Sequence, residues 1–328
     1  MSPVGPIGFA PDGTRALRLD ARMRERLGDS LRYVLEQAGD RLPPPEGLDA
    51  FLARLAAGPV DTQAFGAYYE LVLALDAGDL ASARSFLTEV ATAPSRGADL
   101  VVRPLSDPEV GGFSRRYRRL VDTDPSWPLV IGPPDPREAD ATRVRIADAF
   151  DLLDAAHPEL AAELRGLLGE IVLARAEPGG AGEQFDGVSC FMLWGGLVLR
   201  AGGHESTLEM VEALAHEGAH NLLFGLATDG PLVANDDRER FASPLRSDPR
   251  PLDGIYHATF VTARMHHALT HLLSVGALDA GQRAAAEASL EAHVKHFDEG
   301  IAVVDGRMRL TEMGTATMQS ARDYMRRA

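Results

Sequence analysis

Cysteine is almost absent from this sequence, which contains a single one, Cys190. An intramolecular disulfide is therefore excluded, and so is a small secreted scaffold stapled by several disulfides. A zinc site built from several cysteines is excluded for the same reason. One thiol in a chain of 328 residues fits a reducing cytoplasm, which is our default compartment.

Long apolar runs are also missing. No stretch approaches the roughly 18 consecutive apolar residues of a membrane-spanning helix, so we expect no membrane partner. The first residues, MSPVGPIGFAPDGTRALRLD, lack the basic start and following apolar run of a secretion signal. Both observations favour a cytoplasmic location.

Positive charge is scarce. Lysine and arginine number 33 against 48 aspartates and glutamates, which gives a formal net charge of -15. A surface that binds nucleic acid needs a basic stripe, so we expect no nucleic-acid partner. The hydrophobic share of 45% and the charged share of 25% are those of an ordinary globular protein with a sizeable core.

Most of the chain has the apolar spacing of amphipathic helices. Several such segments precede residue 95, and two short apolar runs, ADLVVRPL and WPLVIGPP, predict strands because turn residues bound them. We expect a mainly α fold with a small β-sheet. We divide the chain into a helical N-terminal region, 1–134, which is a candidate substrate-binding region, and a metal-binding catalytic region, 135–328.

The second region mixes both patterns. PELAAELRGLLGEIVLARA is predicted to begin as a helix and end as a strand. VSCFMLWGGLVLRAG is the best candidate for a strand or a hairpin, with its paired glycines Gly195 and Gly196. A helix from about His204 to Leu226 follows. After a polar, proline-rich segment, three more helices are expected, the first from Gly254 to Leu278.

The stretch EALAHEGAHNLLFGL contains the motif HExxH, formed by His216, Glu217 and His220. Residues four apart share one helix face, so both imidazoles can bind one ion. The helix would then resemble the active-site helix of a zincin, in which the glutamate activates a metal-bound water. A coincidental match is the alternative, but the helical apolar pattern and the preceding strand argue against it.

Two helical histidines need at least one further ligand. The longer motif HExxHxxGxxH would supply one, but positions 223 and 226 are leucines. The next predicted helix contains no glutamate, but it begins with His257, which we predict as the third ligand. His266, His267 and His271 are expected to pack or to lie on the surface. Three other histidines are expected to cap helices or to lie on the surface; they are His204, His293 and His296.

Three histidines on one face of an ion leave three octahedral positions open. This suits a non-haem Fe(II) that binds a bidentate 2-oxo acid and O2, although Zn(II) also tolerates three histidines. The far carboxylate of the co-substrate would need a cation, and the planar fork of arginine pairs with two oxygens at once. SPLRSDPRPLDG supplies Arg246 and Arg250, and the alternative is a charged surface loop.

AHEGAHNLL followed by SPLRSDPRPLDGIYHATFV resembles the HExxH-type 2-oxoglutarate-dependent peptide β-hydroxylases, which modify ribosomally made peptide natural products in bacteria. The similarity covers roughly residues 185–278. It implies Fe(II) bound by His216, His220 and His257, with 2-oxoglutarate anchored by Arg246 or Arg250. It also implies that a precursor peptide is hydroxylated at a β-carbon. Glu217 would then orient a metal ligand or a bound water, and Glu212, one turn before His216, is a second candidate for this role.

Two other interpretations stay open. A zinc metallopeptidase would use the same His216 and His220, with Zn(II) as the metal and Glu217 as general base. A non-catalytic helical module that binds a leader peptide or another partner would need none of these residues for its function.

Overall fold

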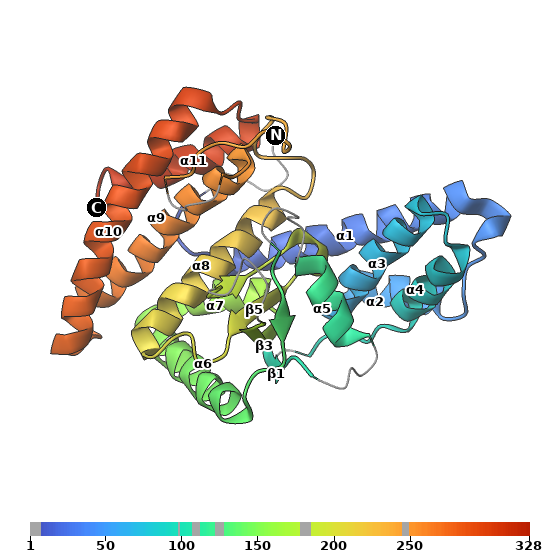
Figure 1. Ribbon diagram of the computed structural model, residues 1–328, viewed down its shortest axis with the longest axis horizontal. Coiled ribbons are helices and arrows are strands. Elements are labelled where there is room, and N and C mark those ends of the chain that lie inside the picture. Colours follow the sequence, from blue (N-terminus) through green and yellow to red (C-terminus); the bar gives the residue numbers. More distant parts are fainter. Residues whose placement is uncertain (1–7, 98, 107–111, 122–127, 178–184, 245–248) are drawn as a thin grey trace. The chain divides into compact units, whose positions relative to one another are not determined.

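The computed structural model describes residues 8–97, 99–106, 112–121, 128–177, 185–244 and 249–328. In these ranges the chain is mainly helical with a small mixed sheet (Figure 1), which confirms the predicted fold class at that level. Among the described helices, none is both long enough and apolar enough to cross a membrane.

The chain divides into two compact units. Unit 1 comprises Met1–Ala16, Val144–Leu164 and Glu205–Ala328, and unit 2 comprises Leu17–Arg143 and Arg165–His204. Both units take residues from either side of position 134. The assignment of substrate binding to 1–134 and of catalysis to 135–328 stays a prediction.

Unit 1 is built around α9, which packs against α8, α10 and α11. Figure 1 shows α9 and α10 side by side, and the long α10 begins at a capping box in which Asp279 and Gln282 bond each other's backbone. The helices of the later sequence are α6 (Pro136–Ala156), α7 (Pro158–Leu167), α8 (Thr207–Leu226), α9 (Leu252–Ser274), α10 (Ala280–Arg307) and α11 (Glu312–Met325).

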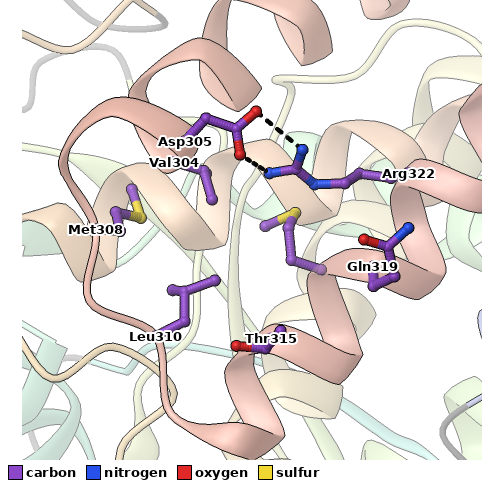
Figure 2. A pocket seen from close by; sticks show the side chains of 8 residues that line it. Val304, Asp305, Met308, Leu310, Thr315, Gln319 and Arg322 are labelled. Carbon is purple, nitrogen blue, oxygen red and sulfur yellow. Dashed lines mark hydrogen bonds and ion pairs between the residues drawn. The ribbon is translucent and has the colours of Figure 1, made fainter.

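A cavity of about 360 Å³ lies between α10 and α11 (Figure 2). At its edge Arg322 donates to both carboxylate oxygens of Asp305, with a distance of 2.9 Å from Nη1 to Oδ2. The hydrogen bonds from Arg322 lower the pKa of Asp305. The Arg322 guanidinium is thus already paired with a carboxylate. The cavity is lined by Val304, Asp305, Met308, Leu310, Thr315, Met318, Gln319 and Arg322.

A buried carboxylate, Glu163 of α7, joins three segments of unit 1. Arg15 donates to its Oε2 at 2.6 Å, and Arg264 of α9 donates to its other oxygen. The backbone N–H of Asp12 also donates to Oε2 at 3.0 Å, and Arg264 donates to the carbonyl of Phe9 at 2.5 Å. Because both guanidinium groups are buried, their charges depend on this one carboxylate.

A group of histidines packs near the middle of α9. His157, in the turn between α6 and α7, stacks on His271 with ring centroids 3.9 Å apart, and its centroid is 5.5 Å from that of His267. Burial lowers the pKa of His157 to about 4 and that of His267 to about 3, and neighbouring histidines and Arg264 add to both shifts. Folding therefore keeps these imidazoles neutral.

Two helices of unit 2, α3 (Thr62–Asp76) and α4 (Leu80–Thr92), start at aspartate caps. Asp61 accepts a hydrogen bond from the N–H of Gln63 at 2.8 Å, and Asp79 accepts one from that of Ser82 at 3.0 Å. The other helices are α1 (Gly13–Ala38), whose first residues belong to unit 1, α2 (Leu48–Ala57) and α5 (Phe113–Val121). Helices α1 to α4 follow the predicted segments.

The sheet of unit 2 has the strand order β1-β3-β5-β4, and β2 pairs with the end of β3. β3 is parallel to both β1 and β5, whereas β4 and β5 form the predicted antiparallel hairpin. Gly195 precedes β5 with φ +78°, a conformation that favours glycine. The strands are β1 (Val101–Pro104), β2 (Ile131–Gly132), β3 (Glu170–Ala176), β4 (Gly187–Val188) and β5 (Gly196–Arg200).

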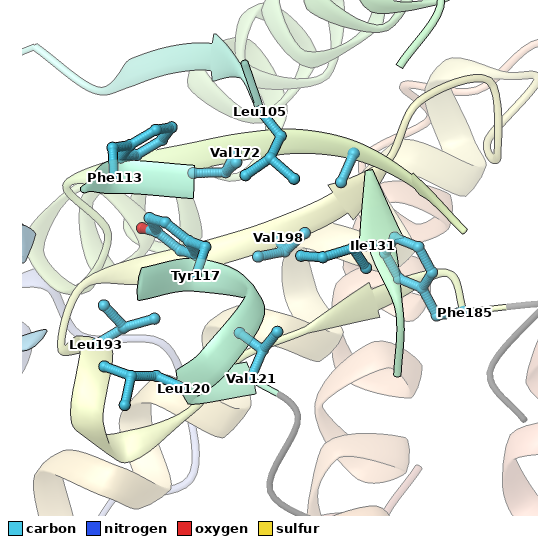
Figure 3. Close-up of a cluster of buried hydrophobic side chains, with 11 residues drawn as sticks. Leu105, Phe113, Tyr117, Leu120, Val121, Ile131, Val172, Phe185, Leu193 and Val198 are labelled. Atoms are coloured by element: carbon cyan, nitrogen blue, oxygen red, sulfur yellow. The ribbon is translucent and has the colours of Figure 1, made fainter. Parts of the chain in front are cut away.

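Helix α5 covers one face of this sheet (Figure 3). Phe113, Tyr117 and Leu120 point from α5 towards Val172 and Val198 of the central strands. The sequence analysis did not predict α5, although its apolar residues recur at helical spacing, because arginines fill the positions between them. This apolar layer closes the core of unit 2.

We expect Glu163→Gln to destabilise unit 1 by about 3–5 kcal/mol, because it leaves two buried guanidinium groups without a counter-charge. Urea unfolding, with amide hydrogen exchange of α7 and α9 as the local readout, measures the effect. Glu159→Gln, an exposed position one turn earlier on α7, is the matched control. Equal stabilities for the two variants would contradict this role for Glu163.

Unit 1 should lose stability on acidification. The pKa values of His157 and His266 are lowered to about 4 from 6.5, so the unfolded chain binds more protons between these values. The contribution is complete above about pH 6.5 and declines by up to about 1.4 kcal/mol per pH unit for each histidine as the pH falls. Unfolding of wild type and His157→Phe between pH 7 and pH 4 tests this, and the variant should show the shallower pH dependence.

Candidate metal centre

The HExxH motif lies in the middle of α8, which belongs to unit 1. The helix starts at Ser206, whose hydroxyl accepts a hydrogen bond from the N–H of Glu209 at 3.2 Å. It runs to Leu226, where the sequence analysis placed its end. His216 and His220 therefore occupy consecutive turns, which confirms the helical spacing on which the predicted ligand pair depends.

Gly218 lies inside the motif, where α7 passes close to α8. A Cβ at this position would collide with the tip of the Leu164 side chain. Glycine weakens a helix interior by roughly 1 kcal/mol relative to alanine, so its presence here is explained by the close approach of the two helices. The contact fixes the part of α8 that contains both histidines.

The second element of the site is the start of α9. Tyr256 is fully buried and donates from its hydroxyl to the carbonyl of Gly314 in α11 at 2.8 Å. Gly314 has no room for a side chain because the backbone of Leu232 lies against it. Since Tyr256 precedes His257, this packing sets the position of the predicted third ligand.

The structure brings the three predicted ligands together. His216 Nε2 lies 3.1 Å from His220 Nε2, and His220 Nδ1 lies 3.1 Å from His257 Nδ1. Two nitrogens bound to one ion at about 2.0–2.1 Å, with about 90–109° between them, lie about 2.8–3.4 Å apart. The first pair thus has the separation of two ligands of one ion, and also that of an N–H···N hydrogen bond.

The third imidazole is adjacent but is not aimed at the same point. His220 presents Nε2 to His216 and Nδ1 to His257, and these two nitrogens point away from each other. Within the described residues, no group of three or more His, Cys, Asp or Glu side chains is arranged as a complete metal site. A three-histidine site therefore requires the rings of His220 and His257 to turn relative to each other.

The protonation states of the His220 and His257 rings suit metal binding. Burial lowers the pKa of His220 well below its usual value, and the neighbouring His216 and His257 lower it further. Burial also lowers the pKa of His257, although Asp253 acts in the opposite direction. Metal ligands must be neutral imidazoles, so at neutral pH a metal has no proton to displace from these two rings.

Two glutamates of α8 lie near the histidines. Glu217 is buried, and its Oε1 is 3.9 Å from His216 Nε2, the nitrogen that faces His220. Glu212 points to α10 instead, where its carboxylate lies 3.2 Å from His293 Nε2 and 3.3 Å from Ser289 Oγ. Glu217 is therefore the carboxylate next to the candidate ion position.

The two candidate anchors for 2-oxoglutarate differ in what the structure describes. Arg246 lies outside the described residues. Arg250 is partly buried, and its backbone exchanges two hydrogen bonds of 2.8 Å with Phe241. Pro251 follows as the N-cap of α9, so Arg250 lies directly at the start of the helix that contains His257. Which arginine binds a co-substrate stays open.

The other histidines are placed in part as expected. His266, His267 and His271 pack within unit 1, as predicted. His204 and His293 are buried, so the expectation that they cap helices or lie on the surface was wrong. The buried ring of His293 has a polar partner, since its Nε2 lies 3.2 Å from the carboxylate of Glu212.

Two neighbours of the site were missed by the sequence analysis. Asp253 lies one turn before His257, with its Oδ2 3.8 Å from His257 Nε2. Phe224 lies one turn after His220, and its ring centroid is 5.4 Å from that of His257. The four-residue spacing from a predicted ligand was the available signal for both. The cavity of Figure 2, by contrast, is lined by none of the motif residues.

No protein-family model matches the chain, and a search among curated proteins finds no match. The resemblance to the peptide β-hydroxylases therefore rests on the quoted motifs alone.

We expect the wild-type protein to bind one equivalent of Co(II) or Zn(II) near pH 7. His216→Ala and His220→Ala each remove half of the pair that faces one position, so binding should be lost, and His257→Ala should weaken it. Isothermal titration measures all of these affinities. His296→Ala, at an exposed position of α10, is the control, and a loss of affinity in this variant or undiminished binding in His220→Ala would contradict the site.

Proposed function

We propose that the protein is an Fe(II)- and 2-oxoglutarate-dependent dioxygenase that hydroxylates a β-carbon in a ribosomally made precursor peptide. The observation that supports this most directly is the cluster of His216, His220 and His257, contributed by two adjacent helices. Helix α9 contains no glutamate that could complete a peptidase-type ligand set. In this proposal His257, near the start of α9, is the third ligand instead.

In this proposal the chain's own residues hold and shield the reacting groups. His216, His220 and His257 bind the metal as neutral imidazoles, and Arg246 or Arg250 binds the far carboxylate of 2-oxoglutarate through its planar fork. When bound, Fe(II) supplies the activation of O2 that decarboxylation of the co-substrate drives. Glu217 is held beside the metal ligands and acts by orienting a ligand or a water.

The zinc metallopeptidase is the second candidate, and one observation favours it. The Glu217 carboxylate lies 3.9 Å from the same nitrogen of His216 that faces His220, where a general base would act on a metal-bound water. The Glu217 side chain is only 5% exposed, however, which leaves a peptide bond little access to it.

The proposed reaction predicts succinate. Protein loaded with Fe(II) under anaerobic conditions and then given 2-oxoglutarate and O2 should form succinate, even without a peptide, since uncoupled turnover is common in such sites. His220→Ala should reduce the rate to background. Mass spectrometry of the reaction mixture measures the succinate, and a mixture without 2-oxoglutarate is the control.

Variants of Arg246 and Arg250 should identify which of the two binds the far carboxylate of 2-oxoglutarate. Arg250→Lys or Arg246→Lys, whichever replaces the anchor, should raise the KM for 2-oxoglutarate by roughly 10-fold or more, because lysine cannot pair with both carboxylate oxygens. If the Zn(II) form instead cleaves a generic peptide and the Fe(II) form yields no succinate, the peptidase takes the place of the dioxygenase.

A further inference from the structure

One carboxylate of α9 is placed to act on a predicted metal ligand. Asp253 lies in the first turn of α9 and is the only acidic residue of that helix. Residues four apart share a helix face, so its side chain reaches along the helix towards His257. The distance from Asp253 Oδ2 to His257 Nε2 is 3.8 Å.

Both nitrogens of the His257 ring are thereby oriented. Nδ1 faces His220 at 3.1 Å, and Nε2 faces the carboxylate. A neutral imidazole has one N–H and one lone pair, and a carboxylate accepts hydrogen bonds but donates none. The tautomer with its proton on Nε2 therefore suits Asp253, and it leaves the lone pair of Nδ1 directed towards α8.

The contact has room to tighten. At 3.8 Å it is longer than a hydrogen bond, but the Asp253 side chain is 43% exposed and is not packed in place, so a small rotation or a bridging water can connect the two groups. The His257 side chain itself is only 10% exposed, so its Nε2 has little access to water. Histidines that bind metals commonly donate their second N–H to a carboxylate in this way.

We propose that Asp253 is a positioning residue that holds the His257 ring in the Nε2–H tautomer, with its Nδ1 lone pair directed towards α8. This inference rests on the metal centre of the proposed function but not on the reaction catalysed there. It assigns Asp253 to the support of a ligand and not to the ligand set itself.

The first test uses the metal-free protein. Nitrogen-15 NMR of the histidine rings, with the His257 signals identified by their loss in His257→Gln, should show the Nε2–H tautomer in wild type. Asp253→Ala should shift the ring towards the Nδ1–H tautomer, and Asp253→Asn, which keeps an acceptor oxygen, should shift it less. Asp298→Asn, an exposed charge on α10, is the control and should leave the tautomer unchanged.

The second test uses Co(II) as the probe. Asp253→Ala should weaken Co(II) binding by roughly 10- to 100-fold while the absorption spectrum of the bound ion stays that of wild type, because the ligands are unchanged. Asp253→Asn should recover part of the affinity. A changed absorption spectrum would show that Asp253 is itself a ligand. An unchanged Co(II) affinity together with an unchanged tautomer would show that Asp253 has no role. Either result overturns this inference and leaves the proposed function standing. Wild-type protein that binds no Co(II) would overturn the proposed function as well.

Discussion

The desolvation of imidazoles between α8 and α9 is the constraint on which the candidate site depends. His220 and His257 are withdrawn from water, and each has another imidazole 3.1 Å away, so protonation of either would place a charge in an environment that cannot solvate it. Neutral rings in contact are the form in which histidine binds metals. In the proposed function, this packing supplies neutral donor atoms.

Packing beyond the site maintains this arrangement from both helices. α8 packs closely on the Leu164 side chain of α7 at Gly218, and α9 is held by the Tyr256 hydrogen bond to α11. Further along α9, Arg264 shares the buried Glu163 with Arg15, so the same helix is tied to α7 and to the N-terminal segment. The two helices that provide the histidines are thus fixed by residues with no chemical role in a metal site.

Sequence reasoning worked where a residue pattern has one local consequence. The four-residue spacing of His216 and His220 on a helix, and the paired glycines that begin β5, each follow from local geometry. It failed where a distant residue decides the outcome. His293 reads as a surface residue on a polar helix, and only the ion pair with Glu212 from α8 explains its burial. α5 was missed because its arginines, one of which is buried against Glu70 and Glu89, hide an apolar face.

The same limit applies to the site itself. The sequence predicts that His257 joins the pair, because α9 offers no glutamate, but it does not predict the direction of each ring, which is set by contacts between helices. In the structure His257 approaches the Nδ1 side of His220, whereas the pair with His216 is formed at Nε2. Rotating a side chain costs much less than moving a helix, so the ring directions depend on local contacts that the sequence pattern does not encode.

Charge balance gives a reason for the two carboxylates that flank the cluster. A divalent ion held by three neutral imidazoles retains its full double positive charge, which is costly in a buried place. Glu217 lies 3.9 Å from His216 and Asp253 lies 3.8 Å from His257, one on each side of the cluster. Two carboxylates at this range offset the charge through the imidazoles without occupying positions on the ion. Such a site keeps those positions for a co-substrate and O2, which is the property that separates the proposed dioxygenase from a site closed by a glutamate ligand.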